Sequence, residues 1–250
     1  MSDGSKVYFI SDVHLGVPDK ASSLKREKLL VQWLNEIEKD AAELYIVGDL
    51  FDFWFEYKTA IPKHFTRVLG KLAAMSDNGL PIHFFTGNHD LWMFGYFQEE
   101  LGIPVYKEPM VKEIMGKKFF IGHGDGLGPG DHGYKFLKKI FTNPLCQWFF
   151  RWLHPDIGIG IADYWSKRSR YVSAVGKIAP HKGDEEWLIQ HARALLEKDH
   201  YDYFIYGHRH IPLNISLKES SNFVNLGDWI THFSYAEFDG SILELKYYRT

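Results

Sequence analysis

Five short apolar segments of this chain each end in a loop that carries aspartate, asparagine or histidine. The segments span 7–10, 44–47, 82–85, 119–121 and 203–206, and their β-branched and aromatic side chains are typical of buried strands. The loops that follow read Asp12-Val13-His14, Gly48-Asp49, Gly87-Asn88-His89-Asp90, Gly122-His123 and Gly207-His208-Arg209-His210. Because an open α/β sheet binds ligands beyond the carboxyl ends of its strands, we expect the polar side chains to meet in one crevice.

Oxygen and imidazole ligands of this kind suit divalent ions such as Mn, Fe, Zn or Ni, and the absence of cysteine from these loops argues against a thiolate site. A single Gly-Asp pair carries little information because most such pairs form turns, and we assign no metal to Gly227-Asp228. Five groups in this order, each directly after an apolar segment, instead predict a centre for two metal ions. Such a pair of ions acidifies a bound water and stabilises an in-line displacement at phosphorus.

The order of these groups resembles the calcineurin-like metallophosphoesterase superfamily, from Val7 to about Trp229. The resemblance implies two divalent ions per chain bridged by Asp49, and it favours Mn, although the ligand set alone does not choose among Mn, Fe, Zn and Ni. It also implies that His89 is not a ligand but faces the substrate phosphate, with Asp90 orienting it. The implied ligands of the first ion are Asp12, His14, Asp49 and His210, and those of the second are Asp49, Asn88, His123 and His208.

The length of 250 residues and the formal net charge of −3 are ordinary for one globular α/β domain, here residues 1–250, and give no sign of nucleic-acid binding. The single cysteine, Cys146, excludes an intrachain disulfide and fits a reducing compartment. Segment 7–10 cannot belong to a cleaved signal peptide, because Asp12 and His14 follow it directly. No apolar stretch approaches the roughly 20 residues that span a bilayer. We therefore expect a cytoplasmic protein, and no protein partner is indicated.

The spacing of apolar residues predicts helices over 21–39 and 62–75, with Pro62 near the start of the second. A hairpin is predicted over 111–121 with Gly116-Lys117 as its turn, followed by a helix over 185–196 and a strand-rich region from residue 203 onward. This alternation implies an α/β fold of the α+β sandwich type. We expect two packed mixed β-sheets flanked by helices, as in the metallophosphoesterase fold.

The segment from about 131 to 171 breaks this rhythm, and its place between the fourth and fifth metal loops predicts a helical insertion over the active site. The segment holds ten aromatic residues, and between Tyr134 and Tyr171 seven Lys or Arg stand against two Asp, a net charge of +5. Apolar and cationic groups together favour an anionic, lipid-like ligand or peripheral attachment to the cytoplasmic face of the inner membrane. The alternative is a helical cap whose aromatic side chains pack into its own core and whose lysines are solvated.

Three further stretches carry a narrower resemblance: 48–54 (Gly-Asp-Leu-Phe-Asp-Phe-Trp), 123–127 (His-Gly-Asp-Gly-Leu) and 226–229 (Leu-Gly-Asp-Trp). They are similar to the UDP-2,3-diacylglucosamine hydrolases, the pyrophosphatases of lipid A biosynthesis. The resemblance implies a lipid-linked nucleotide sugar as substrate, with water attacking the α-phosphorus to give UMP and 2,3-diacylglucosamine 1-phosphate. It also implies that the insertion receives two acyl chains. The candidate substrate contacts are Asp125, Tyr134, Lys167, Arg168 and Arg170.

One position departs from the narrower family, where the residue after the metal-binding asparagine is usually arginine; this chain has His89, as in the superfamily at large. A second hypothesis is therefore another phosphodiesterase or nucleotide hydrolase, which would not need so many aromatic residues in the insertion. A third, a non-catalytic binding scaffold, is disfavoured because every metal position is filled. Asp125 could instead support His123 or shape its glycine-rich loop. Eight further histidines match no ligand position: His64, His83, His132, His154, His181, His191, His200 and His232.

Overall fold

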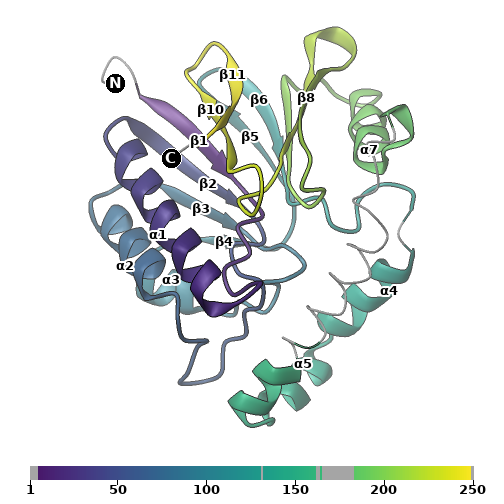
Figure 1. Cartoon of the computed structure of the whole chain (residues 1–250). Coiled ribbons are helices and arrows are strands. Elements are labelled where there is room, and N and C mark those ends of the chain that lie inside the picture. Colours follow the sequence, from purple (N-terminus) through teal and green to yellow (C-terminus); the bar gives the residue numbers. More distant parts are fainter. Residues whose placement is uncertain (1–4, 131, 162–163, 165–182, 249–250) are drawn as a thin grey trace.

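The computed structural model describes residues 5–130, 132–161, 164 and 183–248, and within these ranges two β-sheets pack face to face with helices on their outer sides (Figure 1). Each sheet contains both parallel and antiparallel strand pairs. The expected arrangement of two mixed sheets flanked by helices is therefore confirmed.

One sheet has six strands and the other has five. The first sheet runs, in spatial order, β11 Leu243–Tyr247, β10 Ser234–Phe238, β1 Lys6–Ile10, β2 Ala41–Val47, β3 Ile82–Phe85 and β4 Val105–Tyr106. The second runs β5 Met110–Ile114, β6 Lys117–Ile121, β7 Tyr203–Tyr206, β9 Asn222–Leu226 and β8 Pro212–Ser216. The helices are α1 Lys20–Ile37, α2 Thr66–Asp77, α3 Tyr96–Leu101, α4 His132–Phe141, α5 Pro144–Arg151 and α7 Trp187–Leu196, with short 3-10 turns η1 Gly183–Glu185 and η2 Lys218–Ser220. None of the described helices is both long and apolar enough to cross a membrane.

The central strands are apolar on both faces because both faces are covered. Alternate side chains of a strand point to opposite sides. In β1, Phe9 enters the core between the sheets, whereas Tyr8 packs edge-on against Trp33 of α1. The ring of Phe9 stacks on Tyr45 of β2 at 4.9 Å and on Phe119 of β6 at 5.8 Å between centroids. Aromatic contacts thus join the two sheets directly behind the loops that follow β1 and β2.

Parallel strands at the centre of each sheet carry their loops to one edge of the molecule. Strands β1, β2 and β3 pair in parallel, and so do β6, β7 and β9. The loops are then tied to one another: the Asp12 N–H donates to the Gly48 carbonyl at 3.1 Å, and the Gly207 N–H to the His123 carbonyl at 3.0 Å. A third bond crosses between the sheets, from the Trp229 N–H to the Asp12 carbonyl at 3.1 Å.

Three of the expected elements are confirmed, and one begins later than expected. Helices predicted over 21–39 and 185–196 correspond to α1 and α7, and the hairpin corresponds to β5 and β6. The hairpin turns at Met115-Gly116, one residue earlier than predicted, with the positive φ angles of 49° and 78° that a tight hairpin turn uses. The prediction that Pro62 lies near the start of a helix was wrong. His64 has a φ angle of 93°, outside the right-handed helical region, so α2 starts only at Thr66.

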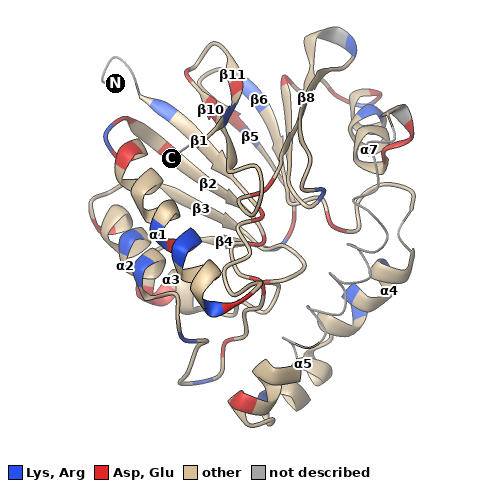
Figure 2. Ribbon diagram, viewed as in Figure 1, with Lys and Arg blue, Asp and Glu red and all other residues tan. Residues whose placement is uncertain are grey.

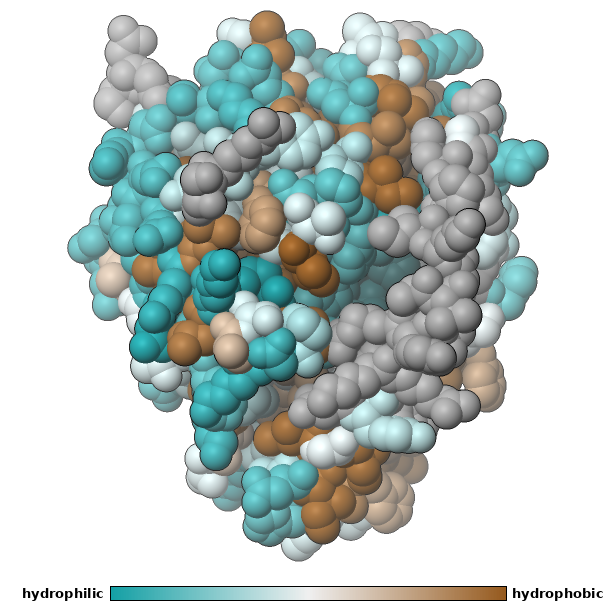
Figure 3. Space-filling view, in the orientation of Figure 1, coloured by the Kyte–Doolittle hydropathy of each residue, from teal (hydrophilic) through white to brown (hydrophobic). Residues whose placement is uncertain are grey.

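The described part of the insertion forms α4, α5 and a helical stretch at 155–161 (Figure 1). Helices α4 and α5, which the structure describes throughout, contain no buried residue. Apolar side chains gather on the surface over α5 (Figure 3), where Leu145 is 67% exposed and Trp152 is 74% exposed. For this part of the insertion, the alternative of aromatic side chains packed into their own core was wrong. Phe150 anchors α5 to the body, with ring centroids 4.7 Å from both Phe55 and Trp92.

Candidate metal centre

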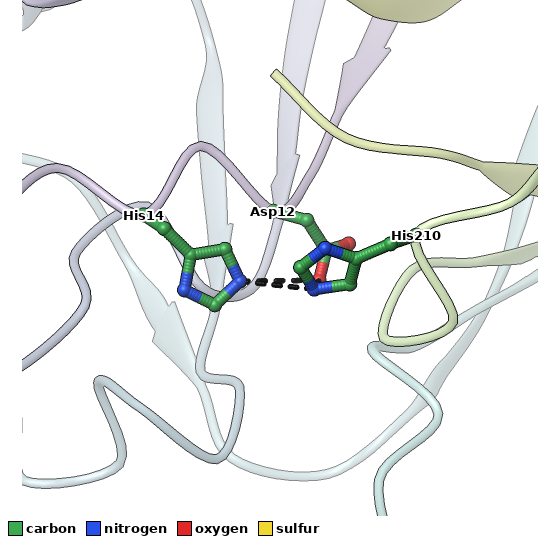
Figure 4. A group of neighbouring side chains, drawn as sticks. All are labelled: Asp12, His14 and His210. Carbon is green, nitrogen blue, oxygen red and sulfur yellow. Dashed lines mark hydrogen bonds and ion pairs between the residues drawn. The ribbon is translucent and has the colours of Figure 1, made fainter. Parts of the chain in front are cut away.

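Two loops from different sheets bring Asp12, His14 and His210 together, and these three residues are called the first group (Figure 4). The Nε2 atom of His14 lies 3.1 Å from Nε2 of His210, which in turn lies 3.2 Å from Asp12 Oδ1. Asp12 and His14 follow β1, whereas His210 follows β7. The first group therefore bridges the two sheets, with one donor atom from each residue within 4.8 Å of the others.

Asp49, His123 and His208 form the second group. The Nε2 atom of His123 lies 3.2 Å from Asp49 Oδ2, and the Asn88 amide oxygen lies 2.9 Å from His208 Nδ1. The same oxygen of Asp49 lies 3.7 Å from His14 Nε2 in the first group. Asp49 thus stands between the two groups, where a carboxylate shared by two ions would lie.

Unsatisfied atoms in this centre fit divalent cations. Asp12 Oδ1 and His123 Nε2 are two of the buried side-chain atoms that make no hydrogen bond among the described residues, although each lies 3.2 Å from an ion-pair partner in the centre. Buried polar atoms normally have a partner, and leaving one unsatisfied costs about 1–3 kcal/mol. The facing imidazole nitrogens of His14 and His210 likewise need a proton or a cation between them. Since carboxylate oxygens and imidazole nitrogens are ligands of Mn, Fe, Zn and Ni, the residues present fit two ions of this class.

The charges of the centre attract positive partners. Burial lowers the pKa of His14, but hydrogen bonds with Asp12 and Asp52 outweigh this effect and raise the pKa to about 10. Burial raises the pKa of Asp49, but the neighbouring imidazoles of His123, His89 and His14 together outweigh it and hold the pKa below its usual range. Without an ion, His14 therefore holds a proton where a cation would bind. A metal ion must displace this proton, so metal affinity should rise with pH.

Five of the seven ligand candidates adopt a left-handed backbone conformation that is uncommon for residues other than glycine. The φ angle lies between 47° and 68° at Asp12, His14, Asp49, His208 and His210. Each such residue costs about 1–3 kcal/mol and persists only where its surroundings fix it, often at functional sites. Glycine makes room beside them: a Cβ atom at Gly87 would lie 2.1 Å from Asp49 Oδ1, and one at Gly207 would lie 2.5 Å from Asp12 Oδ2. The glycines before the ligands are thus required by close approach.

His89 stands at the edge of the centre, next to His14, with ring centroids 4.8 Å apart. Its Nδ1 atom lies 2.9 Å from the carbonyl oxygen of Asp52, which can only accept, so Nδ1 carries the proton and Nε2 is left for another partner. The carboxylate of Asp52 lies 3.3 Å from His14 Nδ1. Sequence reasoning missed Asp52, although an acid three residues after Asp49 was an available signal.

Asp90 has a different place from the one expected. Its buried carboxylate accepts four backbone N–H groups, from Gly87, Asp49, Leu50 and Phe51, at 2.7, 3.3, 2.9 and 3.4 Å. The prediction that Asp90 orients His89 is wrong for this structure, because these N–H groups occupy both oxygens and Asp52 contacts the imidazole instead. Burial and the charge of Asp49 raise the pKa of Asp90 to about 7. Asp90 fixes the loop after β2 against the loop after β3.

Asp125 connects the centre to the insertion. Its Oδ2 atom accepts from the Tyr134 hydroxyl at 2.6 Å and from Lys138 Nζ at 2.8 Å. Lys138 was not among the residues predicted from the sequence. Burial lowers the pKa of His123, whereas the charges of Asp49 and Asp125 help to raise it well above its usual range. Two of the expected substrate contacts are therefore joined to each other beside a ligand candidate. The other three, Lys167, Arg168 and Arg170, lie outside the described residues.

Gly227-Asp228 follows β9 at the same edge of the second sheet, yet the described contacts of Asp228 are those of a turn. One carboxylate oxygen accepts the N–H groups of Ile230 and Thr231 at 2.7 and 2.5 Å. The other lies 2.7 Å from His232 Nδ1. Position at a strand end is thus not sufficient to place an aspartate among the ligand candidates.

Comparison with known proteins agrees with this geometry. The profile of the calcineurin-like phosphoesterase family matches residues 5–212. A UDP-2,3-diacylglucosamine hydrolase from Porphyromonas gingivalis is 38% identical, covering 97% of each chain, and one from Edwardsiella ictaluri is 28% identical, covering 95% of this chain and 90% of the relative. A solved structure of Yfce, a phosphoesterase from E. coli, has 16% identity and a TM-score of 0.47, covering 95% of this chain and 90% of that one. The chain belongs to the calcineurin-like phosphoesterase family, and it is a metal-dependent hydrolase.

Proposed function

We propose that this chain hydrolyses UDP-2,3-diacylglucosamine to UMP and 2,3-diacylglucosamine 1-phosphate, with water attacking the α-phosphorus. The observation that carries the proposal is the pairing of a buried carboxylate and imidazole centre with an exposed aromatic insertion next to it. The P. gingivalis relative that bears this substrate in its name is similar over 97% of the chain, a span that takes in both features of this chain. We propose residues 1–250 as one domain, with the insertion as its substrate-binding cap.

Two divalent ions, by resemblance Mn, are proposed for the two groups. Asp49 would be the shared ligand, and Asn88 would add a neutral oxygen to the second group. When bound, such ions activate a water and offset the charge that develops on phosphorus. The centre leaves no carboxylate of these groups free to act as a separate base, because each is already placed toward a neighbouring imidazole.

The chain's own residues then orient the substrate and handle its protons. Since Nδ1 of His89 donates to the Asp52 carbonyl, Nε2 is the atom available to the phosphate. Burial lowers the pKa of His89, so the imidazole enters the reaction neutral. An anionic phosphate oxygen beside it favours the protonated form, which can donate to the leaving oxygen. Asp125 holds Tyr134 and Lys138 at the edge of the centre, where the ammonium of Lys138 keeps further N–H groups for a phosphate or the sugar.

The insertion supplies the apolar half of the proposed site. Phe136 is 65% exposed on α4 and Phe149 is 65% exposed on α5, a costly arrangement in water unless a ligand or a membrane covers it. Each acyl methylene buried there would contribute about 0.8 kcal/mol. Basic side chains on α4, blue in Figure 2, lie on the same element as these apolar groups. The combination supports peripheral attachment to an anionic membrane surface, which we propose is the cytoplasmic face of the inner membrane.

A second candidate function is hydrolysis of another phosphodiester or nucleotide. His89 favours it, because the general superfamily has histidine at this position where the narrower family usually has arginine. A histidine is shorter than arginine and loses its charge near neutral pH, so it binds a diphosphate more weakly.

Product analysis in isotopically labelled water tests the proposal. The full chain with Mn²⁺ is incubated with UDP-2,3-diacylglucosamine in detergent and ¹⁸O-water, beside Asp49→Ala. The proposal expects UMP that carries the label, unlabelled diacylglucosamine 1-phosphate, and no turnover in the variant. Label in the lipid product would move the attack to the other phosphorus. Intact lipid substrate together with cleavage of bis-p-nitrophenyl phosphate would favour the second candidate.

Flotation on liposomes tests membrane attachment separately. Vesicles with anionic lipid should carry the chain upward at low salt, and Phe149→Ser should weaken this binding. Ile242→Ser is the matched control, because Ile242 is 62% exposed at the turn between β10 and β11, away from the insertion. A wild-type chain that stays at the bottom of the gradient would argue against attachment.

A further inference from the structure

Arg209 lies between two ligand candidates that belong to different groups. His208 belongs to the second group and His210 to the first. The side chain of Arg209 has a partner of its own: its Nε atom lies 2.8 Å from Glu186 Oε1, and its terminal nitrogen donates to Oε2 at 3.2 Å. The side chain of Glu186 is only 9% exposed and that of Arg209 is 30% exposed. Both oxygens of a nearly buried carboxylate therefore face this guanidinium.

The loop that carries Arg209 needs external support. His208 and His210 have φ angles of 68° and 54°, so strained residues flank the arginine on both sides. The Asp12 carboxylate fixes the start of the loop, where the His208 backbone N–H donates to Asp12 Oδ2 at 2.9 Å. Beyond that point the Arg209 side chain ties the loop to Glu186, directly before α7. Helix α7 is a firm anchor because its buried residues pack on the second sheet.

Charge gives the pair a second effect. A guanidinium on the residue between two metal ligands would, if left unpaired, add positive charge to the loop that holds the cations. A nearly buried carboxylate that faces it offsets this repulsion, through one hydrogen bond from the terminal nitrogen and the close approach of Nε to the other oxygen. Glu186 therefore both orients Arg209 and offsets the positive charge of the loop that carries His208 and His210.

We propose that Glu186 and Arg209 are positioning residues for the metal centre, which hold His208 and His210 toward different ions and neutralise the loop that carries them. This role rests on the two-ion centre of the proposed function. It predicts an asymmetry. Glu186→Gln releases the loop and leaves an unpaired cation beside the ions, whereas Arg209→Gln releases the loop but leaves an anion. The first substitution should weaken metal binding more than the second.

Calorimetric titration of the metal-free full chain with Mn²⁺ alone tests this role. We expect affinity to fall about tenfold or more in Glu186→Gln, the usual size for residues that support metal ligands, and by less in Arg209→Gln. The double variant should lie between the two. Glu38→Gln is the matched control, because the Glu38–Lys71 ion pair joins α1 to α2 with nitrogen and oxygen 2.5 Å apart, remote from the centre. The control should bind Mn²⁺ as the wild type does.

Mn²⁺ affinities of both single variants within twofold of the wild type would overturn the proposal, even if the melting temperature of the metal-free chain falls. Equal losses of Mn²⁺ affinity in the two single variants would refute the charge effect and support only the role of the pair as an anchor for the loop. If Glu186→Gln does not fold, Glu186→Asp and Arg209→Lys keep the charges and should weaken binding by lengthening the contact; unchanged affinity would again refute the role. A wild type that binds no Mn²⁺ would refute the two-ion centre itself, and this role with it.

Discussion

Replacing Asp90 by asparagine should destabilise the fold rather than act on the reaction alone. The carboxylate accepts N–H groups from Gly87 and Asp49 on one oxygen and from Leu50 and Phe51 on the other. Asparagine keeps one acceptor oxygen, and its amide nitrogen would face the two N–H groups that remain. Each buried donor left unsatisfied costs about 1–3 kcal/mol, so the loss is at most about 2–6 kcal/mol, because the neutral amide also removes the repulsion from Asp49 that raises the pKa of Asp90. For a chain of this size that corresponds to a melting temperature lower by roughly 5–20 °C.

The assay is thermal unfolding in a chelator, so that lost metal binding does not contribute to the difference. Asp19→Asn is the control, since Asp19 caps α1 by accepting two N–H groups at an exposed helix start and asparagine caps equally well. Its melting temperature should stay near that of the wild type. A variant Asp90→Asn that melts like the wild type yet turns over more slowly would refute the loop-anchoring role and return Asp90 to the catalytic role expected from sequence.

Three further predictions concern the proton donor, the insertion, and Glu43 of β2, whose carboxylate contacts Tyr45, His83 and, on β5 of the other sheet, Lys112. His89→Ala should lower turnover while the Mn²⁺ content measured by mass spectrometry persists, and loss of metal would contradict the role given to His89. Burial raises the pKa of Glu43, but hydrogen bonds from three side chains outweigh it and lower the pKa to about 2; the folded state therefore favours the ionised form. The stability that Glu43→Gln removes at pH 7 should shrink as pH falls from about 4.5 toward 2, and a difference in urea midpoints that is constant with pH would contradict this. Phe150→Ala should speed proteolysis within the insertion with unchanged Mn²⁺ affinity, whereas Phe149→Ala at an exposed neighbouring position should not; equal rates would show that Phe150 is no anchor.

The ligand candidates were accessible to sequence reasoning because each is attached to a local pattern. An apolar segment fixes the strand, and the residues directly after it must lie at the strand's carboxyl end. Parallel pairing then brings such ends together, as it does for β1 with β2 and β6 with β7. Asp228 shows the limit of this reasoning, since it also follows a strand but caps a turn. The order of several groups was informative where a single group was not.

Contacts between distant loops were not accessible in the same way. Asp52 lies three residues after Asp49, but its use depends on His14 and His89, which come from other loops. Asp90 was predicted to act on its sequence neighbour, whereas its oxygens bind the backbone of a loop some forty residues away. Side-chain direction after a tight turn is set by tertiary packing, and sequence spacing does not report it.

The insertion was also predictable only in part. Its aromatic and basic composition predicted apolar and charged groups together, and composition does not distinguish a buried core from an exposed surface. The structure decides this for α4 and α5, where side chains such as Trp152 stay exposed. Among the described ring contacts, Phe150 is the α5 residue that packs onto Phe55 and Trp92. The start of α2 was displaced for a local reason, the left-handed backbone of His64.

Metal stoichiometry tests most directly whether seven side chains from five loops form one centre for two ions. The full chain is freed of metal, dialysed against Mn²⁺ and analysed by mass spectrometry, beside Asp49→Ala and Asp228→Asn. We expect two ions per chain in the wild type and in Asp228→Asn, and loss of both in Asp49→Ala because this carboxylate stands between the two groups. A wild type that holds one ion or none, or an Asp49→Ala chain that keeps two, would contradict the shared centre.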